Sequence, residues 1–228
     1  MKYLFIPTFL TLTMLCCIAC QRGREHVNGN GNNERTSFST AAEAANKAKS
    51  DLLAVLQSDT KINLGVDRAT LEKSQPAMPI KHYQITFQKL LATDSAASFG
   101  NLTENEMTTI VPLVADNSVV TIAGVAKDDK GWKVAALADK SIADDLNALQ
   151  VARGDMSQGE ITIYEMPNSA ERVYGVKKDG SEMFHTNYPG FNIHEGVPAE
   201  RLLSVLRRDA AEFQNKYGAG LKEQKLVR

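Results

Sequence analysis

The chain has no cysteine after position 20. Its three cysteines, Cys16, Cys17 and Cys20, lie together near the start of a 228-residue sequence. If Cys20 is modified and the residues before it are removed, the remaining body has no disulfide, no cysteine nucleophile and no thiolate metal ligand. Such a body depends on its apolar core, and a hydrophobic content of 43% is ordinary for a globular protein.

The sequence also lacks an excess of basic residues. Its 26 lysines and arginines are balanced by 27 aspartates and glutamates, which gives a net charge of −1. Domains that bind nucleic acid normally carry a basic surface. We therefore expect no nucleic-acid partner.

Catalytic and metal-binding motifs are absent from the sequence. It contains no HExxH, no Gly-x-Ser-x-Gly, no phosphate loop, no dinucleotide fingerprint and no calcium loop. His26 and His82 stand apart from other candidate ligands, and the spacing of His185, His194 and Glu195 matches no zinc motif. We expect these histidines to lie on the surface or in turns.

Two pairs of adjacent carboxylates are the remaining candidates for acid–base or metal chemistry. They are Asp128-Asp129 and Asp144-Asp145. Adjacent side chains on a turn or a helix point apart, so we expect these pairs to solubilise a turn and a helix start. The sequence thus predicts no catalytic residue, no metal and no cofactor.

The N-terminal residues have the composition of a signal peptide. Lys2 supplies a positive charge, Leu4–Ala19 is mostly apolar, and Ala19 places a small residue before Cys20. The apolar stretch is shorter than the ~20 residues that a membrane-spanning helix needs. We therefore expect cleavage after residue 19, with an uncleaved anchor or ordinary secretion as alternatives.

The sequence Leu15-Cys16-Cys17-Ile18-Ala19-Cys20 resembles the lipobox of bacterial lipoproteins, although Cys17 stands where that family usually has Leu. The resemblance implies a diacylglycerol thioether on Cys20 and a lipid-anchored protein of the cell envelope. Gln21 and Arg22 follow, without the Asp that commonly marks retention in the inner membrane, so the resemblance favours the outer membrane. Two or three acyl chains give stable attachment to a membrane.

The body after Cys20 divides into a tether and two predicted subdomains. Residues 20–38 are rich in Asn and Gly, which predicts a flexible tether. Residues 39–153 predict an α+β subdomain, residues 154–218 a β-meander with a helix, and residues 219–228 a tail. The predicted fold class is α+β, with antiparallel β-meanders and amphipathic helices on one face.

The first subdomain begins with a predicted helix from residue 40 to about residue 58, marked by capping-box spacing between Thr40 and Glu43. Alternation of Tyr83, Ile85 and Phe87 with polar residues predicts a strand. Further strands are predicted at residues 109–115, 118–126 and 132–138, separated by turns. A short helix, capped by Ser141, is predicted to follow and to extend through Gln150.

The second subdomain has predicted strands at residues 160–165, 172–177 and 181–186. Asp179-Gly180 predicts a tight turn between the last two. An amphipathic helix is predicted to begin at Pro198 and to end before Gly218. Both subdomains therefore have a β-meander followed by a helix.

The single tryptophan opens a strand in Gly131-Trp132-Lys133-Val134. This short segment resembles the closing strand of NTF2-like and cystatin-like envelope domains, in which a Trp packs against a helix. That resemblance implies a cupped sheet whose concave face binds a small ligand or a peptide. Tyr174, Tyr188 and Phe191 are candidates for the rim of such a surface.

The function predicted from the sequence is that of a lipid-anchored envelope protein that binds a small ligand or a protein, or acts as a scaffold, without catalysis. The alternatives are a hydrolase or metal-dependent enzyme whose site is assembled from distant residues, and a purely structural component of the envelope.

Overall fold

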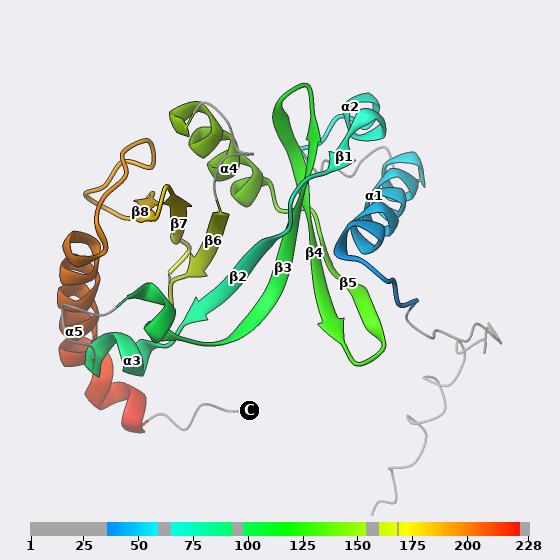
Figure 1. Ribbon diagram of the computed structural model, residues 1–228. Helices are drawn as coiled ribbons and strands as arrows, with labels where there is room; N and C mark the ends of the chain where they lie inside the picture. Colours follow the sequence, from blue (N-terminus) through cyan, green and yellow to red (C-terminus); the bar gives the residue numbers. More distant parts are fainter. Residues whose placement is uncertain (1–35, 59–64, 93–97, 154–159, 168, 224–228) are drawn as a thin grey trace, which may run out of the picture. The chain divides into compact units, whose positions relative to one another are not determined.

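The computed structural model describes residues 36–58, 65–92, 98–153, 160–167 and 169–223 (Figure 1). Cys20, His26 and the predicted signal peptide lie outside the described residues. The contacts group Arg35–Arg228 as one compact unit, and the description that follows concerns this unit.

An eight-stranded sheet forms the centre of the described part of the chain. Its order is β5-β4-β3-β2-β6-β7-β8, and β1 pairs with β3. The pairings are antiparallel except for the parallel pair β2–β6. The strands are β1 Gln75–Pro76, β2 Ile80–Ile85, β3 Thr103–Ala115, β4 Ser118–Asp128, β5 Gly131–Leu137, β6 Glu160–Glu165, β7 Arg172–Lys178 and β8 Ser181–Thr186.

Helices cover both faces of this sheet, where the sequence predicted one face. Ile110 and Ile122 point towards α4, whereas their neighbours Val111 and Ala123 pack against α1. Figure 1 shows α1 and α4 on opposite sides of β3 and β4. The helices are α1 Ala41–Ser58, α2 Arg68–Lys73, α3 Phe87–Ala92, η1 (3-10) Phe99–Leu102, α4 Lys140–Arg153 and α5 Ala199–Glu223. The α+β class is confirmed.

The parallel pairing of β2 with β6 joins the two predicted subdomains. It places Lys81 to Gln84 beside Thr162 to Glu165. The predicted boundary after residue 153 adjoins residues 154–159, which lie outside the described residues. Strands from both sides of this boundary therefore belong to one sheet.

The predicted Thr40 cap of the first helix is confirmed, although the returning bond of Glu43 goes to Ser39 instead of Thr40. The Thr40 hydroxyl accepts the Glu43 backbone N–H at 3.1 Å, and the Glu43 carboxylate accepts the Ser39 N–H at 2.9 Å. Phe38, the last residue assigned to the tether, exchanges two backbone hydrogen bonds of 2.8 Å with Trp132. The chain is therefore held to β5 just before α1 begins.

Small side chains allow α1 to lie close to the sheet. Ala44, Ala45 and Ala48 are fully buried, and α1 packs on β3, β4 and β5. We expect Ala45→Leu to lower the free energy of unfolding by about 1–3 kcal/mol, because the added methylenes overpack this interface. Urea denaturation at constant m-value measures the effect. The matched control is Ala54→Leu on the exposed side of α1; equal midpoints for the two variants would contradict the packing.

The predicted hairpin turns are confirmed by their backbone angles. Asp116 and Asn117 have φ values of 51° and 60°, and Asp179 and Gly180 have 51° and 79°. Two successive left-handed residues match the right-handed twist of the flanking strands, and Asn, Asp and Gly tolerate this conformation best. The residues in the two turns therefore determine where these hairpins form.

Three local predictions are wrong. The strand that contains Tyr83 ends at Ile85, and Phe87 begins α3, because burial of Phe87 and Leu90 against α5 requires the chain to turn. Asp139, instead of Ser141, caps α4: its carboxylate accepts the Ile142 N–H at 3.1 Å. Helix α5 continues through Gly218 to Glu223, since one glycine costs a helix only ~1 kcal/mol.

Candidate functional site

The candidate site is a cleft next to helix α5. Its first part is an apolar cavity of about 220 Å³ between α3, α5, the β6–β7 connection and the residues that follow β8. It is lined by Phe87, Leu90, Met166, Pro167, Ser169, Glu171, Tyr188, Pro189, Leu206, Asp209, Ala210 and Phe213. We call this part the apolar cavity.

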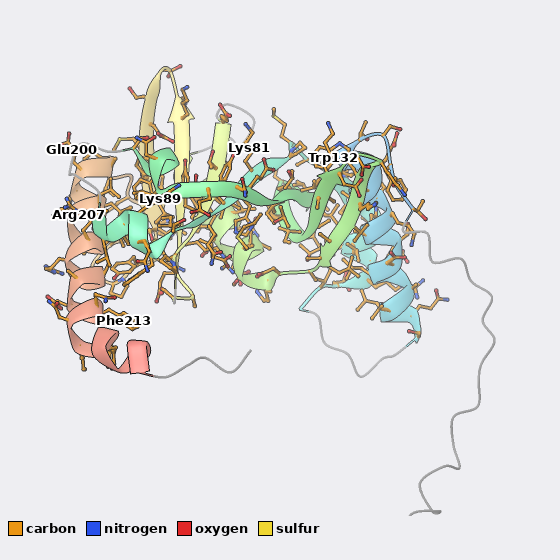
Figure 2. The ribbon with its side chains drawn as sticks, turned by 90° about the horizontal axis from the view of Figure 1, so that it is seen from below. Lys81, Lys89, Trp132, Glu200, Arg207 and Phe213 are labelled. Atoms are coloured by element: carbon orange, nitrogen blue, oxygen red, sulfur yellow. The ribbon has the colours of Figure 1, made fainter. Side chains whose placement is uncertain are left out.

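Helical spacing on α5 builds one wall of the apolar cavity. Leu206, Ala210 and Phe213 recur at intervals of four and three residues, so they share one face of the helix. The Phe213 ring meets Phe87 of α3 edge-on, with centroids 5.9 Å apart. Figure 2 shows Phe213 on α5, next to α3. The apolar face of α5 therefore contributes residues both to the hydrophobic core and to the wall of the apolar cavity.

A hydrogen-bonded pair supplies the polar group of the apolar cavity. The Tyr188 hydroxyl donates to one Asp209 oxygen at 2.9 Å, and Arg208 donates from Nε to the other oxygen at 3.0 Å. Burial and the hydrogen bond to Asp209 raise the pKa of Tyr188 to about 12. Tyr188 therefore remains a protonated donor at neutral pH, and both Asp209 oxygens are engaged.

The second part of the cleft is a more open hollow of about 530 Å³ at the ends of β2 and β3. It shares Phe87 and Pro167 with the apolar cavity, so the two parts adjoin. Its other lining residues are Gln84, Ile85, Thr86, Glu104, Asn105, Glu106 and Met107. We call this part the acidic hollow, since Glu104 and Glu106 are both exposed there.

All charged side chains that line the cleft, among the described residues, are acidic. Glu104, Glu106, Glu171 and Asp209 belong to it, and no lysine or arginine does among the described residues. Lys89 of α3 lies nearby but donates its ammonium group to the Thr103 carbonyl. A cationic group in the cleft would therefore meet carboxylates without a competing basic side chain in the wall.

A cluster of partly buried ionisable side chains lies on the α4 face of the sheet, where β2 pairs with β6. The His82 Nε2 and Glu165 Oε2 atoms are 3.6 Å apart, and the Arg172 Nη2 atom is 4.0 Å from Glu165 Oε1. His82 Nδ1 is hydrogen-bonded to the Thr108 hydroxyl at 3.1 Å. His82 is only 6% exposed, so this cluster is closed to large ligands.

The cluster continues to the start of α4. Arg172 donates to the Ser141 hydroxyl at 2.9 Å and to Asp139 at 3.4 Å. Burial acts to raise the pKa of Asp139, but hydrogen bonds from Ser141 and Ile142 and the charge of Arg172 outweigh it, so the pKa is lowered. The Arg172 guanidinium thus ties β7 to both β6 and α4.

The pKa of Asp145 on α4 is raised, whereas that of Asp139 is lowered. Asp145 accepts the Tyr174 hydroxyl at 2.7 Å. Burial raises the pKa of the Asp145 carboxyl, and it also raises the pKa of the fully buried Tyr174. Tyr174, a candidate rim residue in the sequence, therefore belongs to the core under α4 and not to the cleft.

The burial of His82 should make stability depend on pH. Burial lowers the pKa of His82 below its ordinary value of 6.5. Below pH 6.5 the unfolded chain then binds more protons than the folded one, so stability falls as the pH drops towards the folded-state pKa. Each unit of lowering corresponds to about 1.4 kcal/mol. We expect His82→Gln to remove this loss.

The measurement is urea unfolding between pH 5 and 7.5. The matched control is His194→Gln, because His194 is exposed. Its pH profile should follow that of the wild type. A His82→Gln profile with the wild-type slope would contradict this role of His82.

The other residues singled out in the sequence are dispersed. The expected surface or turn position is wrong for His185, which is buried in β8 and donates from Nδ1 to the Ile193 carbonyl at 2.9 Å. His194 is exposed, as expected. Phe191 lies under Arg201, whose guanidinium is 5.8 Å from the ring centroid. Trp132 packs in the α1 core, and Figure 2 shows it beside α1. Of the three predicted rim aromatics, Tyr188 lines the cleft.

The adjacent carboxylates separate as expected. Asp128 forms an ion pair with Lys133 across the turn, and Asp144 pairs with Lys140 at 2.7 Å one helical turn away. Asp145 is half-buried and accepts the Tyr174 hydroxyl, so the expected solubilising role is wrong for this residue. Within the described ranges, no group of three or more His, Cys, Asp or Glu side chains is arranged to hold a metal ion.

Sequence reasoning missed most of the cleft. Phe87, Pro167, Glu104 and Asp209 come from four separate segments, and none belongs to a motif. The available signals were Tyr188, an aromatic residue near a loop, and the apolar stripe of α5, which does not distinguish a cavity wall from core.

Comparison with family models, curated proteins and solved structures gave no match for this chain. Among the helices of the described residues, none has the length and apolar character to cross a membrane.

Proposed function

We propose that the protein is a lipid-anchored lipoprotein of the bacterial cell envelope, whose folded body binds a partner in the cleft beside α5. Acylated Cys20 is the anchor, and the outer membrane is the favoured site. The small residue Ala19 before Cys20 and the apolar stretch Leu4–Ala19 support the anchor. The cleft supports the binding role.

The size of the apolar cavity is the observation that carries the binding role. Sites for whole small molecules usually measure about 300–1,000 Å³ and enclose most of the ligand. The apolar cavity has only about 220 Å³. The acidic hollow has about 530 Å³, but it is the more open part and most of its lining residues are polar. The apolar cavity therefore suits one or two side chains of a protein segment, with the adjoining acidic hollow open to the rest of that segment. Phe87 and Phe213 offer the aromatic contacts that are enriched at such interfaces.

The polar groups of the apolar cavity favour binding over acid–base chemistry. Tyr188 has a pKa of about 12, far from neutral pH, and Asp209 is held between Tyr188 and Arg208. A general base works best with a pKa near the operating pH and within reach of a substrate proton. Tyr188 and Asp209 form a fixed hydrogen-bonding rim instead.

Site-specific photo-crosslinking in living cells tests this function. The variant Pro189→p-benzoylphenylalanine places the crosslinker at an exposed position of the apolar cavity, and Ala54→p-benzoylphenylalanine places it on α1 as the control. We expect one discrete adduct from position 189 and none from position 54. The same adducts from both positions, or none from position 189, would contradict the proposal.

A further inference from the structure

We infer that the occupant of the cleft is a segment of a partner protein in which a basic side chain neighbours an apolar one. This inference rests on the proposed function, that the cleft is a binding site. It adds the chemistry of the partner: the apolar side chain enters the apolar cavity, and the Lys or Arg side chain lies over the acidic hollow.

The carboxylates of the cleft are available to a cationic partner. Asp209 is paired with Arg208, but in the described part of the chain no ion pair involves Glu104, Glu106 or Glu171. Glu106 accepts the Thr109 hydroxyl at 2.6 Å, which fixes one of its oxygens and leaves the other to accept further bonds. Glu104 and Glu106 are exposed to solvent, so an ion pair between either carboxylate and a basic group of the partner costs little dehydration.

The apolar cavity supplies the second half of the recognition. Leu90 and Leu206 are 1% exposed and form part of its wall, and the rings of Phe87 and Phe213 close one side. Burial of apolar surface is favourable, so an aliphatic or aromatic side chain that enters the apolar cavity contributes to the affinity. Complementary charge then contributes specificity and speed of association.

The two parts adjoin at Phe87 and Pro167, which line both. One ligand with neighbouring apolar and basic side chains can therefore occupy both parts. An anionic ligand, such as nucleic acid or an acidic peptide, would meet like charges from Glu104, Glu106 and Glu171. A purely apolar ligand would make no favourable contact with the carboxylates of the acidic hollow.

The test uses the full-length protein in detergent micelles and two fluorescent hexapeptides. The first is tetramethylrhodamine-Gly-Lys-Phe-Lys-Leu-Gly-amide, and the second has Glu in place of both Lys. We expect fluorescence anisotropy to show at least tenfold tighter binding of the lysine peptide. The affinity for that peptide should fall at least fivefold between 50 and 300 mM salt, because salt screens exposed charges.

Two double variants locate the charge effect. Glu104→Gln with Glu106→Gln should weaken the lysine peptide at least fivefold. Glu195→Gln with Glu200→Gln changes the net charge equally at exposed residues outside the cleft lining and should leave binding unchanged. Equal effects of the two double variants, or equal affinity for the two peptides, would overturn the inference.

Failure of the inference can be separated from failure of the proposed function. If neither peptide binds below 1 mM but position 189 still gives its discrete adduct, the cleft is a binding site and the basic partner is wrong. If the peptides do not bind and position 189 gives no adduct, both proposals are wrong. Binding that Phe213→Ser abolishes but the Glu104 and Glu106 substitutions leave intact also overturns the charge preference.

Discussion

A Cys20→Ala variant should yield no processed, acylated protein in the membrane fraction. The thiol of Cys20 is the proposed attachment point of the diacylglycerol, and each methylene that an acyl chain buries in the bilayer contributes about 0.8 kcal/mol. Loss of all the chains therefore removes the anchor completely. Incorporation of an alkyne-labelled fatty acid, followed by cell fractionation, measures this.

The neighbouring cysteines provide the control for this variant. In Cys17→Ala the small residue Ala19 still precedes Cys20, so this variant should be labelled and should sediment with membranes like the wild type. A Cys20→Ala protein that is processed, labelled and membrane-bound would contradict the proposed anchor. So would loss of label in Cys17→Ala alone.

Arg172→Met should lower the free energy of unfolding by about 1–3 kcal/mol. Removal of one partner from a buried ion cluster typically costs 3–5 kcal/mol, because the opposite charges are left uncompensated. The Arg172 side chain is 12% exposed, but its partners Glu165 and Asp139 are 29% and 36% exposed. Water therefore reaches both carboxylates, which places the expected effect below that range.

Urea denaturation at pH 7.5 measures this effect, and Arg201→Met is the matched control. Arg201 is exposed and its guanidinium lies over the Phe191 ring, so its removal should cost less than about 1 kcal/mol. An Arg172→Met protein as stable as Arg201→Met would show that the charged cluster does not hold β6, β7 and α4 together.

Elements defined by neighbouring residues were predictable from the sequence. Helix α1 follows from the capping box at Thr40 and Glu43, and the hairpins follow from Asp116-Asn117 and Asp179-Gly180. In each case the determining contacts lie within four residues. Local physical chemistry therefore decides these elements, and tertiary packing agrees with it.

Features that depend on distant residues were not predictable. The parallel pairing of β2 with β6 joins residues about eighty positions apart and has no local signature. Phe87 leaves the strand pattern because it packs with Leu90 and Leu206 in the core between α3 and α5 and against the Phe213 ring. Alternating polarity could not reveal this packing.

The candidate site also depends on contacts between residues that are distant in the sequence. The sequence singled out Tyr188 as an aromatic near a loop, and it does line the cleft. It did not identify Asp209, which bonds to Tyr188 across the fold, or His82, whose partner Glu165 lies on another strand. Their roles arise from contacts between separate segments and not from motif spacing.

The central claim is that acylated Cys20 holds this binding body at a membrane, and the intact mass of the full-length protein purified from membranes tests it most directly. We predict the mass of a chain that begins at Cys20 and carries a diacylglyceryl group with or without an additional acyl chain. Tandem mass spectrometry should place the lipid on the first residue. The mass of the complete 228-residue chain, or of a chain with an unmodified Cys20, would contradict the claim.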